Sequence, residues 1–146
     1  MEITLALIKP HVVRNTIAFA AVKQLIKDNF TILDSKEVYI TKALSELFYA
    51  EHKGKFFYNR LTTFMASGPC YAFILQSKDC ISKWRTLMGP TKVFKAVYAH
   101  PGCIRALYGL SDTRNACHGS DSRTAALKEI SILFPDFIKD HIAENS

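Results

Sequence analysis

The chain has 146 residues, of which 49% are hydrophobic and 22% are charged, and its formal net charge is +6. This length and balance predict one globular domain over residues 1–146 and exclude a disordered chain. No apolar run approaches the ~20 residues that span a bilayer, and the positive charge suits a nucleic acid, an anionic surface or nucleotide phosphates as partner.

Hydrophobic periodicity and capping residues predict strands and helices in turn along the chain. The predicted strands cover 3–8, 30–40, 70–75 and 115–118. The predicted helices follow the caps Asn15 and Thr41, cover 58–65 and 81–88, and follow the capping group 120–122 as far as Phe134-Pro135. The β-α-β-β-α-β order predicts an α/β (α+β) fold of the ferredoxin-like, split βαβ type, with a four-stranded antiparallel sheet covered by helices. Residues 89–102 show no clear hydrophobic periodicity and are expected to form a long loop that is functional, disordered or an interface arm.

The N-terminus and the cysteines indicate in which cellular compartment the protein acts. Met1-Glu2 leads straight into apolar residues 3–8, without a basic region or a cleavage site, so no secretory signal is expected. The strand also begins too early for an ordinary transit peptide, so we expect a cytoplasmic protein, with the mitochondrion as the alternative. The cysteines lack zinc-finger spacing and are expected to be free thiols; they are Cys70, Cys80, Cys103 and Cys117.

A histidine stands where the last predicted strand passes into the last helix, in Asn115-Ala116-Cys117-His118-Gly119-Ser120-Asp121-Ser122. Helix N-termini attract phosphate, and a neutral imidazole is a competent nucleophile near pH 7. The alternative is a structural histidine, which is the commoner role for such a residue taken alone. A dyad of Cys117 and His118 is disfavoured, because adjacent side chains on an extended segment point to opposite faces.

Glu129 lies at the edge of the apolar stripe of the last predicted helix. A carboxylate in that position needs a partner, because burying an unpaired charge is costly. We expect His118 to be that partner, directly or through Ser120. The alternative is a surface carboxylate that pairs with Arg123 or Lys128.

The sequence contains neither GxxxxGK[ST] nor GxGxxG, so side chains must hold any nucleotide. Asn115-x-x-His118-Gly119-Ser120-Asp121 resembles the active-site signature of the nucleoside diphosphate kinase family. The resemblance runs from residues 5–10 to 134–135 and includes motifs at 48–55, 64–69 and 88–91. Residues 84–91 and 109–115 are similar to the divergent nucleoside diphosphate kinase 6 branch of that family.

The resemblance implies a kinase that transfers the γ-phosphate of a nucleoside triphosphate to a nucleoside diphosphate by a ping-pong mechanism. ATP and other nucleoside di- and triphosphates would be its ligands. It implies a phosphohistidine on His118, with Ser120 and Glu129 orienting the ring. Tyr49 would form a hydrogen bond near the nucleophile and the transferred phosphoryl group. Mg²⁺ would arrive with the nucleotide, and Asp121 is the nearest candidate for a water-mediated contact with it.

The resemblance also implies a nucleotide site built from side chains. Lys9, Arg85, Thr91 and Arg105 would hold phosphate oxygens, Asn115 and Lys9 the ribose, and Phe57 and Leu61 the base by stacking. Each of these residues has an alternative as a core residue, a surface ion pair or a loop cap. Their joint occurrence favours the nucleotide site.

The sequence departs from the family pattern in four places. Phe56 stands where a proline usually precedes the stacking Phe57, and Asp112 stands where an apolar residue usually lines the base slot. The stretch from Thr91 to Arg105 is longer than usual, and the chain ends soon after Phe137. Both of the last two regions normally brace subunits, so we expect a homo-oligomer that is weaker than is typical. Its apolar contact residues would be Val93, Phe94, Val97 and Tyr98.

Two competing hypotheses remain. The first is a weakly active or regulatory nucleotide-binding family member that acts through a protein partner, which only the departures support. The second is a nucleic-acid binder or nuclease, which rests on charge alone. The basic residues are scattered rather than gathered in a long run, so a nucleic-acid partner is disfavoured. No membrane partner is expected.

Overall fold

A computed structural model describes residues 1–144, which contain a four-stranded sheet. The strands are β1 (Glu2–Ile8), β2 (Thr31–Tyr39), β3 (Pro69–Ser77) and β4 (Cys117–Gly119). Their order across the sheet is β2-β3-β1-β4, and all neighbouring pairs are antiparallel. This is the ferredoxin-like α+β fold that the sequence predicts.

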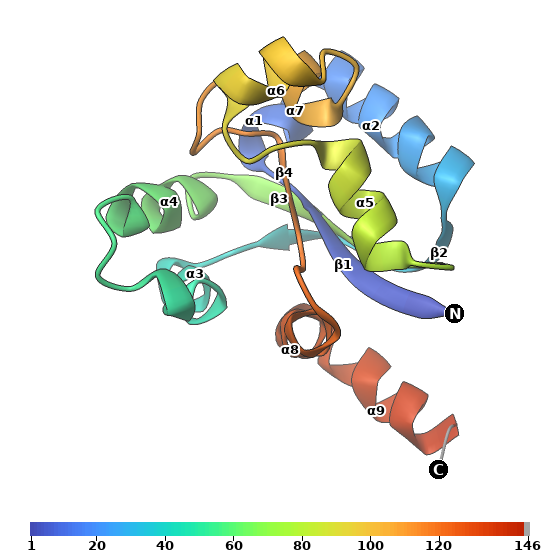
Figure 1. Ribbon diagram of the computed structural model, residues 1–146. Coiled ribbons are helices and arrows are strands. Elements are labelled where there is room, and N and C mark those ends of the chain that lie inside the picture. Colours follow the sequence, from blue (N-terminus) through green and yellow to red (C-terminus); the bar gives the residue numbers. More distant parts are fainter. Residues whose placement is uncertain (145–146) are drawn as a thin grey trace.

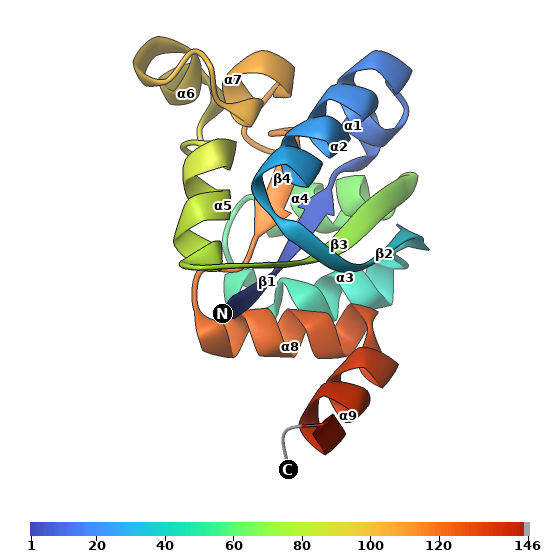
Figure 2. The same cartoon turned by 90° about the vertical axis from the view of Figure 1, so that its right-hand side faces the viewer.

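Helices cover both faces of the sheet (Figure 1). One face carries α1 (Pro10–Val13), α2 (Thr16–Asn29), α5 (Cys80–Met88), α6 (Val93–Ala99) and α7 (Ile104–Tyr108). The other face carries α3 (Lys42–Phe48), a 3-10 turn (Ala50–His52), α4 (Tyr58–Met65), α8 (Arg123–Leu133) and α9 (Pro135–Glu144). Helix α9 points away from the sheet beyond α8 (Figure 2). No helix within residues 1–144 is both long and apolar enough to cross a membrane.

The alternation of side chains along β1 divides the core into two clusters. Ala6 and Ile8 pack in the cluster beneath α2 and α5, whereas Leu5 and Leu7 pack in the cluster beneath α4 and α8. Successive side chains of a strand point to opposite faces, so a strand that is covered on both faces is apolar throughout. Each fully buried Leu or Ile side chain contributes roughly 1.5–3 kcal/mol to the stability of the fold.

A β-bulge in β2 changes which face its side chains reach. The register with β3 shifts between Ile32 and Asp34, which leaves Leu33 as the extra residue. Ile32 therefore packs in one cluster, whereas Val38 and Ile40 pack in the other. Without the extra residue these even-numbered side chains would share one face.

Three side chains cap helices as the sequence predicts. The cap residues are Asn15 of α2, Thr41 of α3 and Ser122 of α8. Each side-chain oxygen accepts a hydrogen bond of 3.1 Å from the backbone N–H three residues further on. Such caps satisfy N–H groups that the first turn of a helix leaves unpaired.

The segment 89–102 differs from the expected loop, because residues 93–99 form α6. This helix buries only Ala96, so it has no apolar stripe from which the sequence could reveal it. Phe94 and Tyr98 are 84% and 88% exposed. The additional helix α9 begins with Pro135, a residue that is favoured at the first position of a helix.

Candidate active site

The centre of the candidate site is a hydrogen-bonded group of His118, Glu129 and Ser120. The Nε2 atom of His118 lies 2.5 Å from the Oε1 atom of Glu129, and the Ser120 hydroxyl donates to the same oxygen at 3.1 Å. Glu129 projects from α8 and is only 8% exposed. A carboxylate accepts hydrogen bonds, so Nε2 carries the proton and the lone pair of the neutral ring lies on Nδ1.

Strand pairing and aromatic packing fix the position of the His118 ring. β4 pairs with β1, which places His118 opposite Leu7, and the indole N–H of Trp84 donates to the His118 carbonyl at 3.2 Å. On the ring's own side of the sheet, Phe48 and Tyr49 lie with centroids 5.0 and 5.8 Å away, both edge-on. Cys117 packs in the cluster on the opposite face, as its place beside His118 in an extended segment predicts.

Tyr49 brings a buried hydroxyl to the same group. The residue is 4% exposed, and its Oη atom has no hydrogen-bond partner among the residues that the structure describes. Burial raises the pKa of Tyr49 far above its usual range, so the hydroxyl is a neutral donor. An unpaired buried hydroxyl is costly, and a ligand oxygen that accepts its proton would relieve that cost.

Lys9 follows β1 directly and is 4% exposed. Its Nζ atom donates to the Thr113 carbonyl at 3.2 Å. Burial, reinforced by the nearby Arg105 guanidinium, lowers the pKa of Lys9 to about 7. A bound phosphate would raise this pKa again, because a neighbouring negative charge favours the ammonium form.

Arg105 and Asn115 form a buried polar layer beside Lys9. The Arg105 guanidinium donates to the Gly89 carbonyl at 2.8 Å and to the Cys117 carbonyl at 3.1 Å, which ties α7 to β4 and to the end of α5. The Asn115 amide donates to the Thr91 carbonyl at 3.1 Å. Within the described part of the chain, Nε of Arg105 and Oδ1 of Asn115 are buried without a partner. Fixed polar atoms that lack partners are suited to contact a polar ligand.

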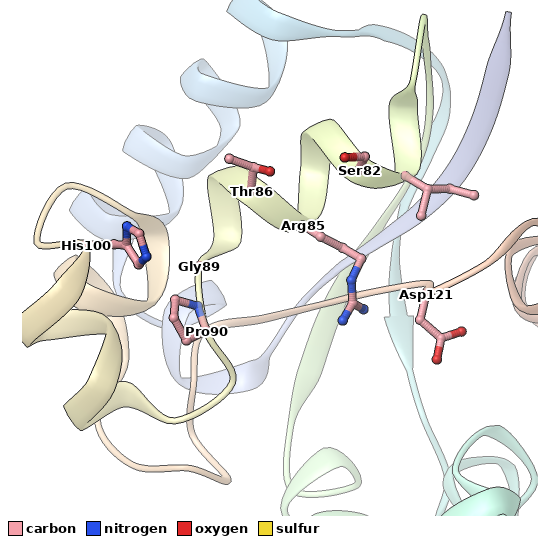
Figure 3. Close-up of a pocket in the computed structure, with 8 residues that line it drawn as sticks. Ser82, Arg85, Thr86, Gly89, Pro90, His100 and Asp121 are labelled. Carbon is pink, nitrogen blue, oxygen red and sulfur yellow. The ribbon is translucent and has the colours of Figure 1, made fainter.

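Arg85 and Asp121 border a pocket of about 570 Å³ beside α5. The pocket is lined by Ile81, Ser82, Arg85, Thr86, Gly89, Pro90, His100 and Asp121. Figure 3 shows the Arg85 side chain extending from α5 toward the segment that carries Asp121. Arg85 also donates to the Gly119 carbonyl at 3.4 Å, immediately after His118. The pocket therefore lies beside the histidine rather than over its ring.

The predicted base-binding residues lie on and before α4. Leu61 is 8% exposed and packs in the core, whereas Phe57 is half-buried. The Phe57 ring packs on His52 at 5.4 Å, and His52 stacks on Tyr49 at 6.2 Å, so a row of rings joins Phe57 to His118. The sequence analysis gave His52 no role. Its position three residues after Tyr49, which is about one helical turn, could have indicated that the two side chains lie together.

Thr91 follows α5 with an exposed side chain, and the only hydrogen bond that the structure gives it runs through its carbonyl. Its hydroxyl is thus free to meet a ligand that approaches from solvent. The structure places Lys9, Arg105 and Asn115 deep in the fold and Thr91 and Arg85 at its surface. The residues predicted to hold the phosphates and the ribose therefore form a buried layer and an exposed layer.

Asp121 is the carboxylate at the pocket that could contact a magnesium ion carried by a nucleotide. No group of three or more His, Cys, Asp or Glu side chains suited to a metal occurs within residues 1–144. Mg²⁺ often keeps several waters and binds through substrate phosphates with one or two carboxylates. Asp121, an exposed carboxylate beside Arg85 at the pocket, is such a group.

The family model for nucleoside diphosphate kinase matches residues 2–138. The chain belongs to the nucleoside diphosphate kinase family. Its relatives in this family include nucleoside diphosphate kinase 6 of Danio rerio, which is 50% identical over 137 residues, or 94% of this chain and 78% of that protein. Nucleoside diphosphate kinase 6 of Homo sapiens is 50% identical over 138 residues, or 94% of this chain and 74% of that protein. The chain is thus close to the nucleoside diphosphate kinase 6 branch.

A solved nucleoside diphosphate kinase structure shares the fold. The Aquifex aeolicus enzyme superposes with a TM-score of 0.85 at 33% identity, over 91% of this chain and 94% of that one. The ferredoxin-like sheet and its covering helices are therefore those of a nucleoside diphosphate kinase.

Proposed function

We propose that this member of the family is an active nucleoside diphosphate kinase that transfers phosphate through His118. The observation that carries the proposal is the hydrogen bond between Nε2 of His118 and the buried carboxylate of Glu129. It leaves the Nδ1 lone pair for attack and holds the ring in one orientation. Ser120 donates to the same carboxylate oxygen and so positions Glu129.

The reaction has two similar halves. In the first, the Nδ1 lone pair of His118 attacks the γ-phosphorus of a nucleoside triphosphate. The bond to the β–γ bridging oxygen breaks, and a nucleoside diphosphate leaves. In the second, a terminal oxygen of another diphosphate attacks the same phosphorus, the N–P bond breaks, and neutral His118 is restored. Glu129 stabilises the positive charge that the ring gains while it carries the phosphoryl group.

The buried cations would supply the electrostatic part of catalysis. Phosphoryl transfer leaves a protein mostly positioning and charge stabilisation to perform. Lys9 and Arg105 are both under a tenth exposed, and backbone carbonyls hold their donors in place. Tyr49 would donate its unpaired hydroxyl to the transferred group.

The remaining predicted residues would hold the rest of the nucleotide. Arg85 and Thr91 would meet the phosphates at the surface, Asn115 and Lys9 the ribose, and Phe57 the base by stacking, with Leu61 beneath it. Mg²⁺, held by the phosphates with a water-mediated contact to Asp121, would neutralise charge on the phosphate chain. A base held by stacking is accepted whatever its identity, because every base has a π-face.

Self-association and location belong to the same proposal. We expect homo-oligomers, because α6 exposes Phe94, Val97 and Tyr98, which is more apolar surface than a solvated helix needs. We expect the protein to act in the cytoplasm, with the mitochondrion as the alternative. A regulatory member without turnover is not favoured, because a residue of suitable chemistry stands at every predicted catalytic position.

Replacement of the nucleophile tests the proposal. His118→Ala is expected to abolish phosphate exchange between ATP and a second nucleoside diphosphate, because it removes the Nδ1 lone pair that attacks the phosphorus. An unfolding temperature equal to that of the parent would show that the variant keeps the fold. Exchange by His118→Ala at the parent rate would overturn the mechanism.

A further inference from the structure

The strand that carries His118 is short and lies at one edge of the sheet. β4 spans only Cys117–Gly119, and within residues 1–144 it pairs with β1 alone. Each of its three carbonyls also accepts a hydrogen bond from a side chain of α5 or α7, namely Cys117 from Arg105 at 3.1 Å, His118 from Trp84 at 3.2 Å and Gly119 from Arg85 at 3.4 Å. Side chains of two helices therefore hold the backbone of the strand in place.

Of these three donors, Trp84 is the one without a predicted contact to the nucleotide. Arg85 and Arg105 are cations to which the proposed function assigns phosphate oxygens. Trp84 is fully buried, and the single N–H of its indole is already bonded to the His118 carbonyl. Trp84 is therefore placed to act on the nucleophile rather than on the ligand.

Close packing fixes the indole of Trp84 against β4. A Cβ atom on Gly119 would lie 2.5 Å from Cδ1 of Trp84 and 2.7 Å from Cε of Met88, so only a glycine allows this approach. Trp84 and Met88 are four residues apart on α5 and therefore lie on the same face of the helix. The Phe30 ring packs edge-on against the indole, with centroids 6.1 Å apart. The N–H donor is thus preorganised for the His118 carbonyl.

We propose that Trp84 is a positioning residue, which holds the backbone of His118 so that the imidazole keeps its hydrogen bond to Glu129. β4 lies between α5, whose Trp84 bonds to the His118 carbonyl, and α8, whose Glu129 bonds to the His118 ring (Figure 1). A shift of β4 relative to α8 would lengthen the bond between the ring and the carboxylate. The inference rests on the proposed function, in which the orientation of this ring determines the rate of phosphoryl transfer.

Two replacements remove the donor and keep an aromatic ring in the core. Trp84→Phe is the simpler one. Replacement of Trp84 by benzothienylalanine, in which sulfur takes the place of the indole N–H, preserves the shape of the ring and keeps the test decisive if Trp84→Phe does not fold. Met88→Leu is the matched control, because it changes the packing of α5 on Gly119 without removing a hydrogen bond.

Single-turnover phosphorylation of the protein by ATP with Mg²⁺ tests the effect on the reaction. In both Trp84 variants the maximal rate should fall about threefold to tenfold, which corresponds to the loss of a neutral hydrogen bond. The ATP concentration that gives half of this rate should stay at the parent value, because Trp84 does not contact the nucleotide. Met88→Leu should keep the parent rate. An unchanged maximal rate in the Trp84 variants, or an equal fall in Met88→Leu, would overturn the proposal.

Nuclear magnetic resonance of the Nε2 proton of His118 separates this proposal from the catalytic one, because it needs no turnover. The bond to Glu129 should slow the exchange of this proton with water in the parent and in Met88→Leu. Exchange should be faster in both Trp84 variants. If the parent transfers no phosphate and yet exchange is faster in the Trp84 variants, the proposed function fails while the positioning of His118 by Trp84 stands. Equal exchange in the parent and the Trp84 variants would overturn the inference even in an active enzyme.

Discussion

The buried and exposed halves of the candidate site hold their side chains in different ways. Around His118, Glu129, Lys9 and Arg105 lie within the core, and each is hydrogen-bonded to another side chain or to the backbone. At the surface, Arg85 and Thr91 are exposed; a 3.4 Å hydrogen bond to the Gly119 carbonyl holds Arg85, and both side chains lose further freedom when a ligand binds. The packing that holds the sheet also preorganises the reacting end, so changes there should act on rate, whereas changes at the surface should act on affinity.

The largest effect is expected for the buried cations. Lys9→Ala and Arg105→Ala should each cost about 2–4 kcal/mol of transition-state stabilisation, the range for a lost preorganised donor. The sequence has no glycine loop to share that task. The measurement is kcat/KM, with the exposed Lys27→Ala on α2 as the control that removes an equal charge. Normal kcat/KM in both core variants would remove the proposed role of these cations.

The next effect concerns the carboxylate behind the nucleophile. Glu129→Gln keeps the shape but removes the charge that favours the phosphorylated, cationic ring. The expected loss is about 1.5–3 kcal/mol, the range for a hydrogen bond to a charged group. Because Glu129 contacts His118 and not the nucleotide, kcat should fall while KM stays near the parent value. A raised KM with an unchanged kcat would contradict this role.

A smaller effect on stability is expected from His11, whose ring nitrogens are buried in the same half. Burial lowers the pKa of His11 to about 4, and Lys9, Arg114 and Arg14 add to the shift, although the Tyr108 carbonyl opposes it. As the pH falls below 6.5, His11 binds a proton in the unfolded chain but stays neutral in the folded chain. The free energy of unfolding therefore decreases as the pH falls toward 4. Since the residue is only partly buried, we expect a loss of about 1–2 kcal/mol.

Urea unfolding at pH 7 and pH 4.5 measures this loss. His11→Asn has no charge to gain, so it should lose less stability than the parent between the two values. Other groups titrate in this range too, and the difference between the two proteins isolates His11. Equal losses in both proteins would show that His11 is already solvated in the fold.

The smallest effect on catalysis is expected from the outer surface of α6. Phe94→Ser should leave kcat near the parent value, because Phe94 is 84% exposed, but it should weaken self-association. Light scattering across a dilution series measures the mass, with Lys95→Ala as the control on the same helix. A parent protein that is monomeric at every concentration would contradict association, and a hexamer that persists at nanomolar concentration would contradict its expected weakness.

The sequence predicted the elements that bury a regular apolar face. β1 and β3 follow from short runs that are apolar throughout, α2, α3 and α8 from apolar residues at helical spacing, and α4 and α5 from the Gly-Pro breakers that come after them. The elements that it missed bury one or two residues each where these are described: α6 buries Ala96, α1 buries Pro10 and Val12, and α7 buries Ile104 and Arg105. The bulge at Leu33 left no composition signal, because it is set by pairing with β3.

The same distinction applies to the site. The signature around His118 and the position of Glu129 on its helix predicted a contact that the structure makes, because both depend on local spacing. Other contacts depend on segments that are far apart in the chain. They include the burial of Lys9 and His11 and the packing of the His52 ring between Tyr49 and Phe57. No local pattern reports such contacts.

Incubation of the protein with γ-labelled ATP tests whether His118 carries the phosphoryl group. We expect a covalent label on the parent that is released by acid, as a phosphohistidine would be, and no label on His118→Ala. Addition of an unlabelled nucleoside diphosphate should remove the label from the parent. An acid-stable label, or equal labelling of His118→Ala, would contradict transfer through His118.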